Sequence, residues 1–510
     1  MDVVVGAGHN GLVAACYLAQ AGRDVVVLEQ LDRPGGGSRT EETVPGYRFD
    51  LHSAAHNLIN MTDIPADLDL AGAGLDYLEM DPFSVAIHAD GRRVRFFRSV
   101  EATVESIAEV SPAEAMAYRR FIHVAEPVVR AILPAVRGDP ARAVLTKRAG
   151  DVARVLRYGP PVVRDVVSSF EALLRRRLPS DLTRGPVAAF AAHAGVGPSL
   201  PGGALYAFWQ AAYHLFGQWH GRGGAQNLTD ALVARLASLG GQLRTSAPVA
   251  HIEAPGGRAG AVVLEGGERI PAAAVITAID PKTALLGLLD PPLAGRAGAA
   301  LAAARRSNVV QAVVHVATDA LPSYPDSRPG DWNGLQSYVD SLDELRVAWA
   351  QAEGGRLPES LPLYAFTPSS IDASLAPPGR HTVYLATPAA PARVEGGWPA
   401  RREELVERCL DVVEARAPGF RRSVQAVATW TPDEMERVER WPGGHPMYLD
   451  IALDQLGPLR PSRALGRWRT PIEGLYVSGA GTNPSGGICG TPGRMAARAL
   501  LADAATPPRR

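Results

Sequence analysis

The first eleven residues contain glycines at a spacing suited to phosphate binding. The apolar run Val3–Val5 leads into Gly6-Ala7-Gly8-His9-Asn10-Gly11, and an apolar stretch of helical length follows. In a strand–turn–helix unit of this kind, Gly6 makes the tight turn, Gly8 lets the backbone approach a pyrophosphate, and Gly11 lets the helix pack on the strand. The helix N-terminus would face the phosphates with free N–H groups and the positive end of its dipole.

A carboxylate follows the next predicted strand. The apolar run Val25–Leu28 is followed directly by Glu29. A carboxylate at this spacing accepts hydrogen bonds from both hydroxyls of an adenosine ribose and repels a 2′-phosphate. The turn, the strands, the helix and Glu29 together predict a dinucleotide-binding fold.

A second glycine-rich loop comes where a nicotinamide dehydrogenase would continue into another helix and strand. It contains Gly36, Gly37, Ser38 and Arg39. A second phosphate loop with Arg39 as a fixed cation suits a dinucleotide whose pyrophosphate and ribityl chain extend across the domain. The sequence therefore predicts that the cofactor is FAD.

The C-terminal region carries a matching pattern. An apolar strand at 474–478 ends at a bend that contains Gly479 and Gly481, and Gly487-Ile488-Cys489 precedes a predicted helix. The N-terminal turn of this helix, near Gly490, would point N–H groups at the pyrimidine edge of the flavin ring, where negative charge gathers on reduction.

A middle segment repeats the helix–strand layout. It contains Gly223-Gly224, a helix to Leu239 and the strand residues Val249 and Ile252.

Together these motifs resemble the superfamily of FAD-dependent phytoene (carotenoid) desaturase-like enzymes and amine oxidases. The segment from Gly443-Gly444-His445-Pro446 to Gln455 resembles the uncharacterised phytoene desaturase-like oxidoreductases more closely than the true carotenoid enzymes. The resemblance implies that Val249 contacts the adenine through its backbone. It also implies that the closing motif, with Gly479, Gly481, Gly487, Ile488 and Cys489, contacts the flavin.

Length and motif positions predict an α/β protein in which a Rossmann-type FAD-binding domain is interleaved with an α+β substrate-binding domain. The motifs assign residues 1–60, 200–285 and 425–510 to the FAD-binding domain, and residues 61–199 and 286–424 to the substrate or cap domain. Stretches 309–316 and 381–385 are typical of strands in a second sheet, and 104–178 is helical in pattern.

Composition narrows the function class. The chain has 510 residues and a formal net charge of −1, so no overall positive field favours nucleic acid. Its three cysteines form neither a disulfide framework nor a metal cluster, which points to the cytoplasm. The first strand starts at the third residue, which leaves no room for a signal peptide, and no apolar run approaches the ~20 residues of a spanning helix.

Basic residues alternate with apolar ones between 130 and 178, which raises the question of a membrane-binding helix. The charges are spread over several predicted helices and interrupted by aspartates, which favours a solvated face over a membrane surface. At most peripheral membrane contact is expected. The basic residues are Arg130, Arg137, Arg142, Lys147, Arg148, Arg154 and Arg157.

Histidines are the candidate proton carriers. His52 and His56 follow the second phosphate loop, Trp219 and His220 precede Gly223-Gly224, and His445 precedes the closing strand. All three segments return to the flavin, so these residues are expected to line the pocket. His56 or His220 could then accept a proton in a dehydrogenation. Replacing that histidine with Ala should slow the reduction of the flavin by substrate ~10²–10⁴-fold. The spacing of His52 and His56 would also suit a metal, but no third ligand accompanies them and none is expected.

The function predicted is an FAD-dependent dehydrogenase that desaturates an organic small molecule by hydride transfer to the flavin, with oxygen, a quinone or another acceptor regenerating it. The polar and aromatic content of 206–220 and the subgroup resemblance favour a compact secondary-metabolite intermediate, which can be polar, over a long polyene. Two alternatives remain open, a carotenoid or polyene desaturase and a flavin-dependent isomerase without net redox change.

Overall fold

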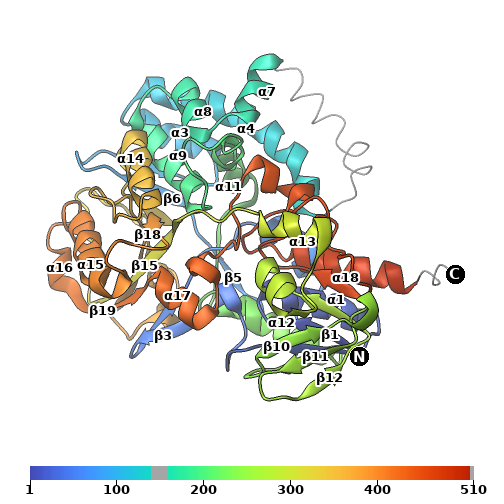
Figure 1. Cartoon of the computed structure of the whole chain (residues 1–510). Coiled ribbons are helices and arrows are strands. Elements are labelled where there is room, and N and C mark those ends of the chain that lie inside the picture. The colour runs from blue at the N-terminus through green and yellow to red at the C-terminus, as the bar shows by residue number, and fades with distance from the viewer. Residues whose placement is uncertain (139–158, 506–510) are drawn as a thin grey trace.

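The computed structural model describes residues 1–138 and 159–505. A parallel sheet of five strands lies at one end of the molecule, beside the N-terminus (Figure 1). Its strand order is β20-β13-β1-β2-β9, so segments from the beginning, middle and end of the chain meet in one sheet. The strands are β1 (Asp2–Val5), β2 (Val25–Leu28), β9 (Gln242–Arg244), β13 (Ala274–Thr277) and β20 (Leu475–Val477).

Both faces of this sheet are covered, which explains why its strands are continuous apolar runs. Side chains alternate along a strand, so Val4 packs with the helices on one face while Val3 and Val5 pack with a four-stranded sheet on the other. The helices are α1 (His9–Gln20), α12 (Gln226–Ser238) and α18 (Thr491–Ala504). The four-stranded sheet contains β10 (Val249–Glu253), β11 (Ala261–Leu264), β12 (Arg269–Pro271) and β14 (Leu289–Asp290).

The second large sheet has seven strands in the order β19-β15-β18-β17-β16-β6-β7. Its long central strands are the two that the sequence predicts, and they pair antiparallel. The strands are β6 (Ser84–Ile87), β7 (Arg93–Phe96), β15 (Val309–Thr318), β16 (Leu335–Ser337), β17 (Tyr364–Phe366), β18 (His381–Pro391) and β19 (Val424–Trp430).

Helices cover this sheet on both faces (Figure 1). One face packs against a helical layer through Val309, Val313 and Phe366, and the other packs against α15 (Trp398–Glu414) through Val314 and Leu385. The helical layer contains α3 (Val100–Ala108), α4 (Pro112–Val136), α7 (Pro160–Val167), α8 (Phe170–Arg177), α9 (Asp181–His193), α10 (Ala204–Phe208), α11 (Gln210–Phe216) and α14 (Leu342–Glu353).

Shorter helices and strands complete the fold. Two-stranded sheets pair β3 with β4 and β5 with β8. These elements are β3 (Thr40–Val44), β4 (Tyr47–Asp50), α2 (Ile64–Asp67), β5 (Tyr77–Glu79), β8 (Trp219–Gly221), α13 (Gly295–Ala302), α16 (Phe420–Ser423) and α17 (Pro432–Glu439).

Packing places three boundary segments differently from the sequence-based division. Residues 425–430 form part of β19, inside the seven-stranded sheet. The α10–α11 segment packs its apolar side chains into the helical layer, whereas Ile64 and Leu68 pack with α1 and α12 in the core of the nucleotide-binding sheet. The motifs that guided the division mark the cofactor loops, but the apolar faces decide which sheet each neighbouring segment covers.

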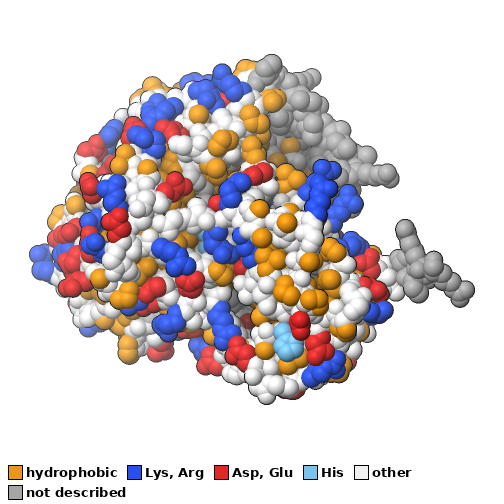
Figure 2. Space-filling view, in the orientation of Figure 1, with side chains coloured by type: hydrophobic (Ala, Val, Ile, Leu, Met, Phe, Trp, Pro, Cys, Tyr) orange, Lys and Arg blue, Asp and Glu red, His pale blue; other side chains and the backbone are white. Residues whose placement is uncertain are grey.

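Acidic and basic side chains are intermingled on the face seen in Figure 2. Within the described residues, no helix is both long and apolar enough to cross a membrane. Arg130 forms an i,i+4 ion pair with Glu126, and Arg137 donates to the carbonyl of Met61. Five basic residues of the predicted amphipathic stretch, Arg142, Lys147, Arg148, Arg154 and Arg157, lie outside the described residues.

Candidate functional site: a dinucleotide-binding cavity

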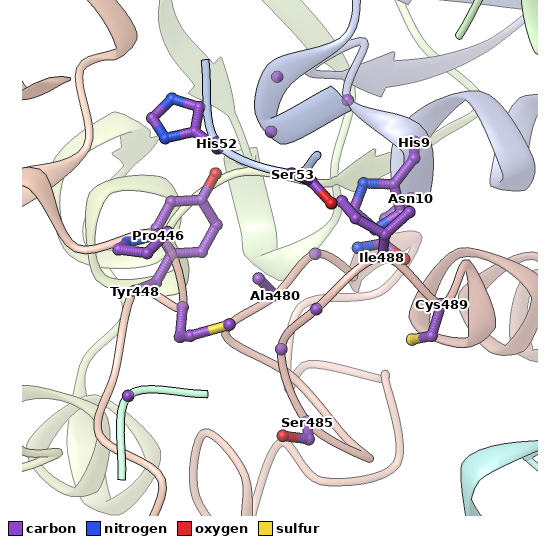
Figure 3. Close-up of a pocket in the computed structure, with 18 of the residues that line it drawn as sticks. His9, Asn10, His52, Ser53, Pro446, Tyr448, Ala480, Ser485, Ile488 and Cys489 are labelled. Carbon is purple, nitrogen blue, oxygen red and sulfur yellow. The ribbon is translucent and has the colours of Figure 1, made fainter. Parts of the chain in front are cut away.

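A cavity of about 530 Å³ begins at the N-terminus of α1. Gly6, Gly8, His9 and Asn10 line it, so the free N–H groups of the first helical turn open onto this space. His9 Nε2 and Asn10 Oδ1 are buried and have no hydrogen-bond partner in the structure. Figure 3 shows both side chains beside Ile488 at one end of the cavity. Unpaired buried polar groups of this kind are costly, so they indicate a polar ligand here.

The two glycine-rich loops lie against each other on the cavity wall. Gly8 forms an isolated bridge with Gly35, and Gly36 has a positive φ of 53°. A Cβ atom added at Gly36 would lie 3.2 Å from the Cα of Gly8. The bare backbone of both loops, with Gly37, is therefore what allows an elongated phosphate group to approach.

Glu29 lies at the opposite side of the first turn, at the end of β2. Its Oε2 accepts from Ala7 N at 2.8 Å and its Oε1 accepts from Leu31 N at 3.1 Å. Burial raises the pKa of this carboxyl, and the two backbone N–H groups oppose that shift. Glu29 lines the cavity, and so does Val249 of β10. This geometry suits an adenosine ribose and an adenine.

The closing motif forms the other side of the cavity. Gly479, Gly487, Ile488 and Cys489 all line it. Figure 3 shows Ala480, Ser485, Ile488 and Cys489 along one wall, with Tyr448 and His52 across from them. Helix α18 begins immediately after Cys489, with Gly490 as its N-cap, so the helix N-terminus approaches the cavity behind this thiol.

Four predicted cofactor residues do not line the cavity. Gly11 and Gly481 lie at packing contacts, where an added Cβ would meet Gly6 O at 1.9 Å and Pro281 Cδ at 2.5 Å. Ser38 is fully buried, and its carbonyl accepts from Thr229 Oγ1. Gly11, Ser38 and Gly481 therefore support the cofactor loops through packing contacts and do not line the cavity.

Arg39 is the fourth, and its charge is engaged by protein carboxylates. Its guanidinium lies 2.9 Å from Glu439 Oε1 and 3.0 Å from Glu41 Oε1. The sequence predicts a cation for the pyrophosphate, whereas the structure joins Arg39 to the last residue of α17. The signal for this pairing lies 400 residues downstream at Glu439, so local spacing could not reveal it.

Two predicted histidines line the cavity. His52 Nε2 accepts a hydrogen bond from Trp430 Nε1 at 3.2 Å and lies 3.7 Å from Glu439 Oε1. His445 Nε2 lies 3.6 Å from Asp450 Oδ1. Burial lowers the pKa of both rings, although the neighbouring carboxylates oppose the shift. Both are therefore positioned as neutral polar groups on the wall.

The structure places His56, Trp219 and His220 outside the cavity lining. His56 N donates to Trp219 O at 2.7 Å, and the His56 ring pairs with Tyr77 Oη at 2.7 Å. Burial lowers the pKa of His56 to about 3. This position does not support direct proton transfer by His56, so its catalytic role stays a prediction.

His220 belongs to a buried ionic cluster behind the 52–55 segment. Its Nε2 lies 3.5 Å from Asp372 Oδ2 and its Nδ1 lies 4.0 Å from Asp50 Oδ2. Burial alone would lower the pKa of the imidazole, but the two carboxylates reverse this and raise it. Burial would raise the pKa of Asp372, but hydrogen bonds from His220, Ser374 and the backbone N–H of Gly223 hold it far below its usual range. This arrangement indicates that His220 has a structural role, as the cation between two buried carboxylates.

We therefore expect His220→Asn to lower the stability of the protein by ~3 kcal/mol, because it leaves two buried carboxylates without a cation. Since the folded pKa of His220 is raised, its contribution is complete below the unfolded pKa and fades as pH rises through the folded value. Urea unfolding midpoints of wild type and variant should differ most below the ordinary histidine pKa and converge as the pH rises above it. A difference that grows with pH would contradict this role.

Sequence reasoning missed the apolar half of the cavity. Beyond the cofactor loops, α4, α9, the α10–α11 segment and strands β16 and β17 contribute a lobe of aliphatic and aromatic side chains. These are Ile132, Ala135, Val136, Phe190, Leu205, Tyr206, Trp209, Tyr213, Leu335 and Phe366. Helical periodicity marks such residues as core, and nothing local distinguishes a core side chain from one that faces a cavity.

No group of three or more His, Cys, Asp or Glu residues suited to a metal ion occurs in the described part of the chain. The cavity, by contrast, has two phosphate loops, a ribose acceptor, orphaned polar atoms and an apolar lobe. The residues present fit FAD. The fold and this site define an FAD-dependent oxidoreductase of the dinucleotide-binding class.

The chain belongs to the family of flavin-containing amine oxidoreductases, whose model matches residues 11–501. It is 30% identical to mouse (Mus musculus) pyridine nucleotide-disulfide oxidoreductase domain-containing protein 2, over 98% of this chain and 93% of the relative. It is 29% identical to the hydroxyneurosporene desaturase of Cereibacter sphaeroides, over 99% and 98%. A structure of putrescine oxidase matches with a TM-score of 0.63 at 19% identity, covering 99% of this chain and 98% of that one, and shows the shared fold.

Cys489 lies on the cavity wall but is not a reactive thiol. Burial raises its pKa to about 11, so the thiol stays protonated near neutral pH. We expect acid or heat denaturation to release all of the flavin as free FAD and the denatured chain to be colourless. A yellow denatured protein in wild type, absent from Cys489→Ser, would show a covalent link instead.

Proposed function

We propose that this enzyme dehydrogenates a neutral, mainly apolar organic compound, a secondary-metabolite intermediate. FAD, when bound, accepts the hydride that leaves the substrate. Loss of that hydride and of one proton from adjacent atoms creates a double bond, and the proton passes to solvent or to a protein group. Oxygen or a quinone is the class of acceptor proposed to reoxidise the cofactor.

The observation that carries this proposal is the continuity of the cavity. The space lined by the phosphate loops runs without interruption into the apolar lobe between α4, α9 and the α10–α11 segment. An apolar pocket with a few polar groups, at the junction of two sheets, is typical of a small-molecule site. Residues of the lobe exclude water and hold an apolar substrate beside the cofactor.

The cavity does not offer a counter-ion to an amine. Three carboxylates line it among the described residues, and each is already engaged. Glu29 accepts from two backbone N–H groups, Asp280 pairs with Arg306 at 2.9 Å, and Glu439 pairs with Arg39. A buried ammonium group would lack a paired charge, which is costly. This supports a neutral substrate despite the amine oxidoreductase family.

Anaerobic flavin bleaching tests the proposal. The holoenzyme would be mixed without oxygen with a panel of neutral terpenoid compounds, hydroxyneurosporene and putrescine. We expect neutral compounds to bleach the visible absorption of FAD and putrescine to leave it unchanged. Bleaching by hydroxyneurosporene alone would favour a polyene desaturase. Bleaching by putrescine alone would overturn the proposal, and rearranged product without bleaching would favour an isomerase.

A further inference from the structure

A polar cluster interrupts the apolar lobe where it meets the seven-stranded sheet. Gln311, on strand β15, lines the cavity there. Its side-chain Nε2 donates to the hydroxyl of Tyr364 and to the hydroxyl of Tyr384, the latter at 2.9 Å. Two bonds to buried tyrosines fix the plane of this carboxamide.

The tyrosines also fix which end of the carboxamide faces the cavity. A tyrosine hydroxyl has one hydrogen, and that of Tyr384 is donated to the carbonyl of His52 at 3.1 Å. Tyr384 can therefore only accept from Gln311, which places Nε2 toward the tyrosines. The Oε1 atom of Gln311 has no donor among residues 1–138 and 159–505, so it is a free acceptor on the cavity wall.

His193 contacts Tyr364, one of the two tyrosines that accept from Gln311. It is the last residue of α9, lines the same cavity, and packs edge-on against Tyr364 with ring centroids 5.1 Å apart. Its ring nitrogens have no hydrogen-bond partner within the described part of the chain. Burial lowers the pKa of His193 to about 4, so the ring is neutral near pH 7 and carries one N–H donor and one acceptor.

We propose that Gln311 and His193 form a binding point for a hydroxyl group, so that the substrate is an apolar compound with an alcohol function. The assignment rests on the proposed dehydrogenation for the nature of the bound molecule. The hydroxyl donates to Gln311 Oε1 and accepts from the His193 N–H. An ether or ketone has no hydrogen to donate, so it leaves Gln311 Oε1 buried and unpaired.

Binding to the oxidised holoenzyme tests this without turnover. Geraniol and its methyl ether would be titrated under anaerobic conditions and followed by the shift of the FAD absorption band. We expect the wild type to bind the alcohol roughly 10-fold more tightly than the ether, as the loss of one buried hydrogen bond predicts. Gln311→Leu should bring the two dissociation constants together, and His193→Phe should reduce the preference in the same direction.

Gln425→Leu is the matched control, because it makes the same substitution at an exposed glutamine that does not line the cavity. It should keep the preference for geraniol. Equal binding of the two probes by wild type, an unchanged preference in Gln311→Leu, or binding of neither probe would overturn the assignment. An alcohol preference without bleaching by any compound would count against dehydrogenation alone. Bleaching without the preference would count against the hydroxyl site alone.

Discussion

Gly11→Ala is expected to abolish retention of FAD. A Cβ atom at this position would lie 1.9 Å from the carbonyl oxygen of Gly6 and 3.2 Å from the Cβ of Ala278. Backbone atoms in the tight turn cannot move aside as a flexible side chain could, so helix α1 must shift away from the sheet. The N–H groups of its first turn would leave the phosphate position, and overpacking of this severity would cost roughly 3 kcal/mol or more.

Gly22→Ala provides the matched control at the other end of the same helix. Gly22 has a positive φ of 77°, and an added Cβ would meet nothing within 4 Å. This variant should lose only about 1–2 kcal/mol of stability from its left-handed backbone and should keep its FAD. The measurements are the flavin-to-protein absorbance ratio after gel filtration and the unfolding midpoint. Full retention of FAD by Gly11→Ala would contradict this prediction, because it would show that the turn between β1 and α1 can open without loss of cofactor binding.

The second large effect is expected from Glu29→Gln, which should weaken FAD binding ~10²-fold. Backbone N–H groups of Ala7 and Leu31 each donate to one oxygen of this carboxylate. A carboxamide can satisfy only one of them, and its NH₂ group faces the other donor. The variant also loses the charged acceptor for the ribose hydroxyls. Equilibrium titration of the apoprotein with FAD measures the change.

The pH dependence of binding provides a second test at Glu29. Because burial raises the pKa of this carboxyl, protonation should weaken FAD binding as pH falls, beginning at a higher pH than for a free glutamate. Glu265→Gln is the control, since Glu265 is an exposed acid that pairs with Arg440. It should bind FAD as the wild type does. Acid-sensitive binding that persists unchanged in Glu29→Gln would assign the effect to another group.

Interleaving of the chain explains how one cavity serves both cofactor and substrate. The glycine loops come from the first forty residues, the closing wall comes from 479–489, and the apolar lobe comes from helices and strands in between. Residues 439–448 then cross the cofactor end, where Gln30 Nε2 donates to Glu439 O at 3.0 Å and Arg39 pairs with the Glu439 side chain. Segments that are remote in sequence are therefore held together at the cavity.

Local sequence was sufficient for the cofactor loops. Gly6, Gly8, Glu29, Gly36 and Gly37 all line the cavity, because they belong to short strand–turn units whose geometry depends on residues within a few positions. The position of the closing motif was predicted for the same reason, because Gly487, Ile488 and Cys489 lie between the end of a strand and the start of a helix. Such units fold in the same way wherever they occur, so spacing alone predicted an α/β fold and FAD.

Side chains whose role depends on a distant partner were decided only by the tertiary structure. Arg39 is equally able to bind a phosphate or a carboxylate, and packing of the 439–441 segment selected Glu439. His220 and His193 have the same chemistry in sequence, yet one is enclosed between Asp372 and Asp50 while the other faces the cavity. Sequence determines which groups are available, but burial and long-range contacts determine which of them stay unpaired, and an unpaired buried polar group is what a ligand binds.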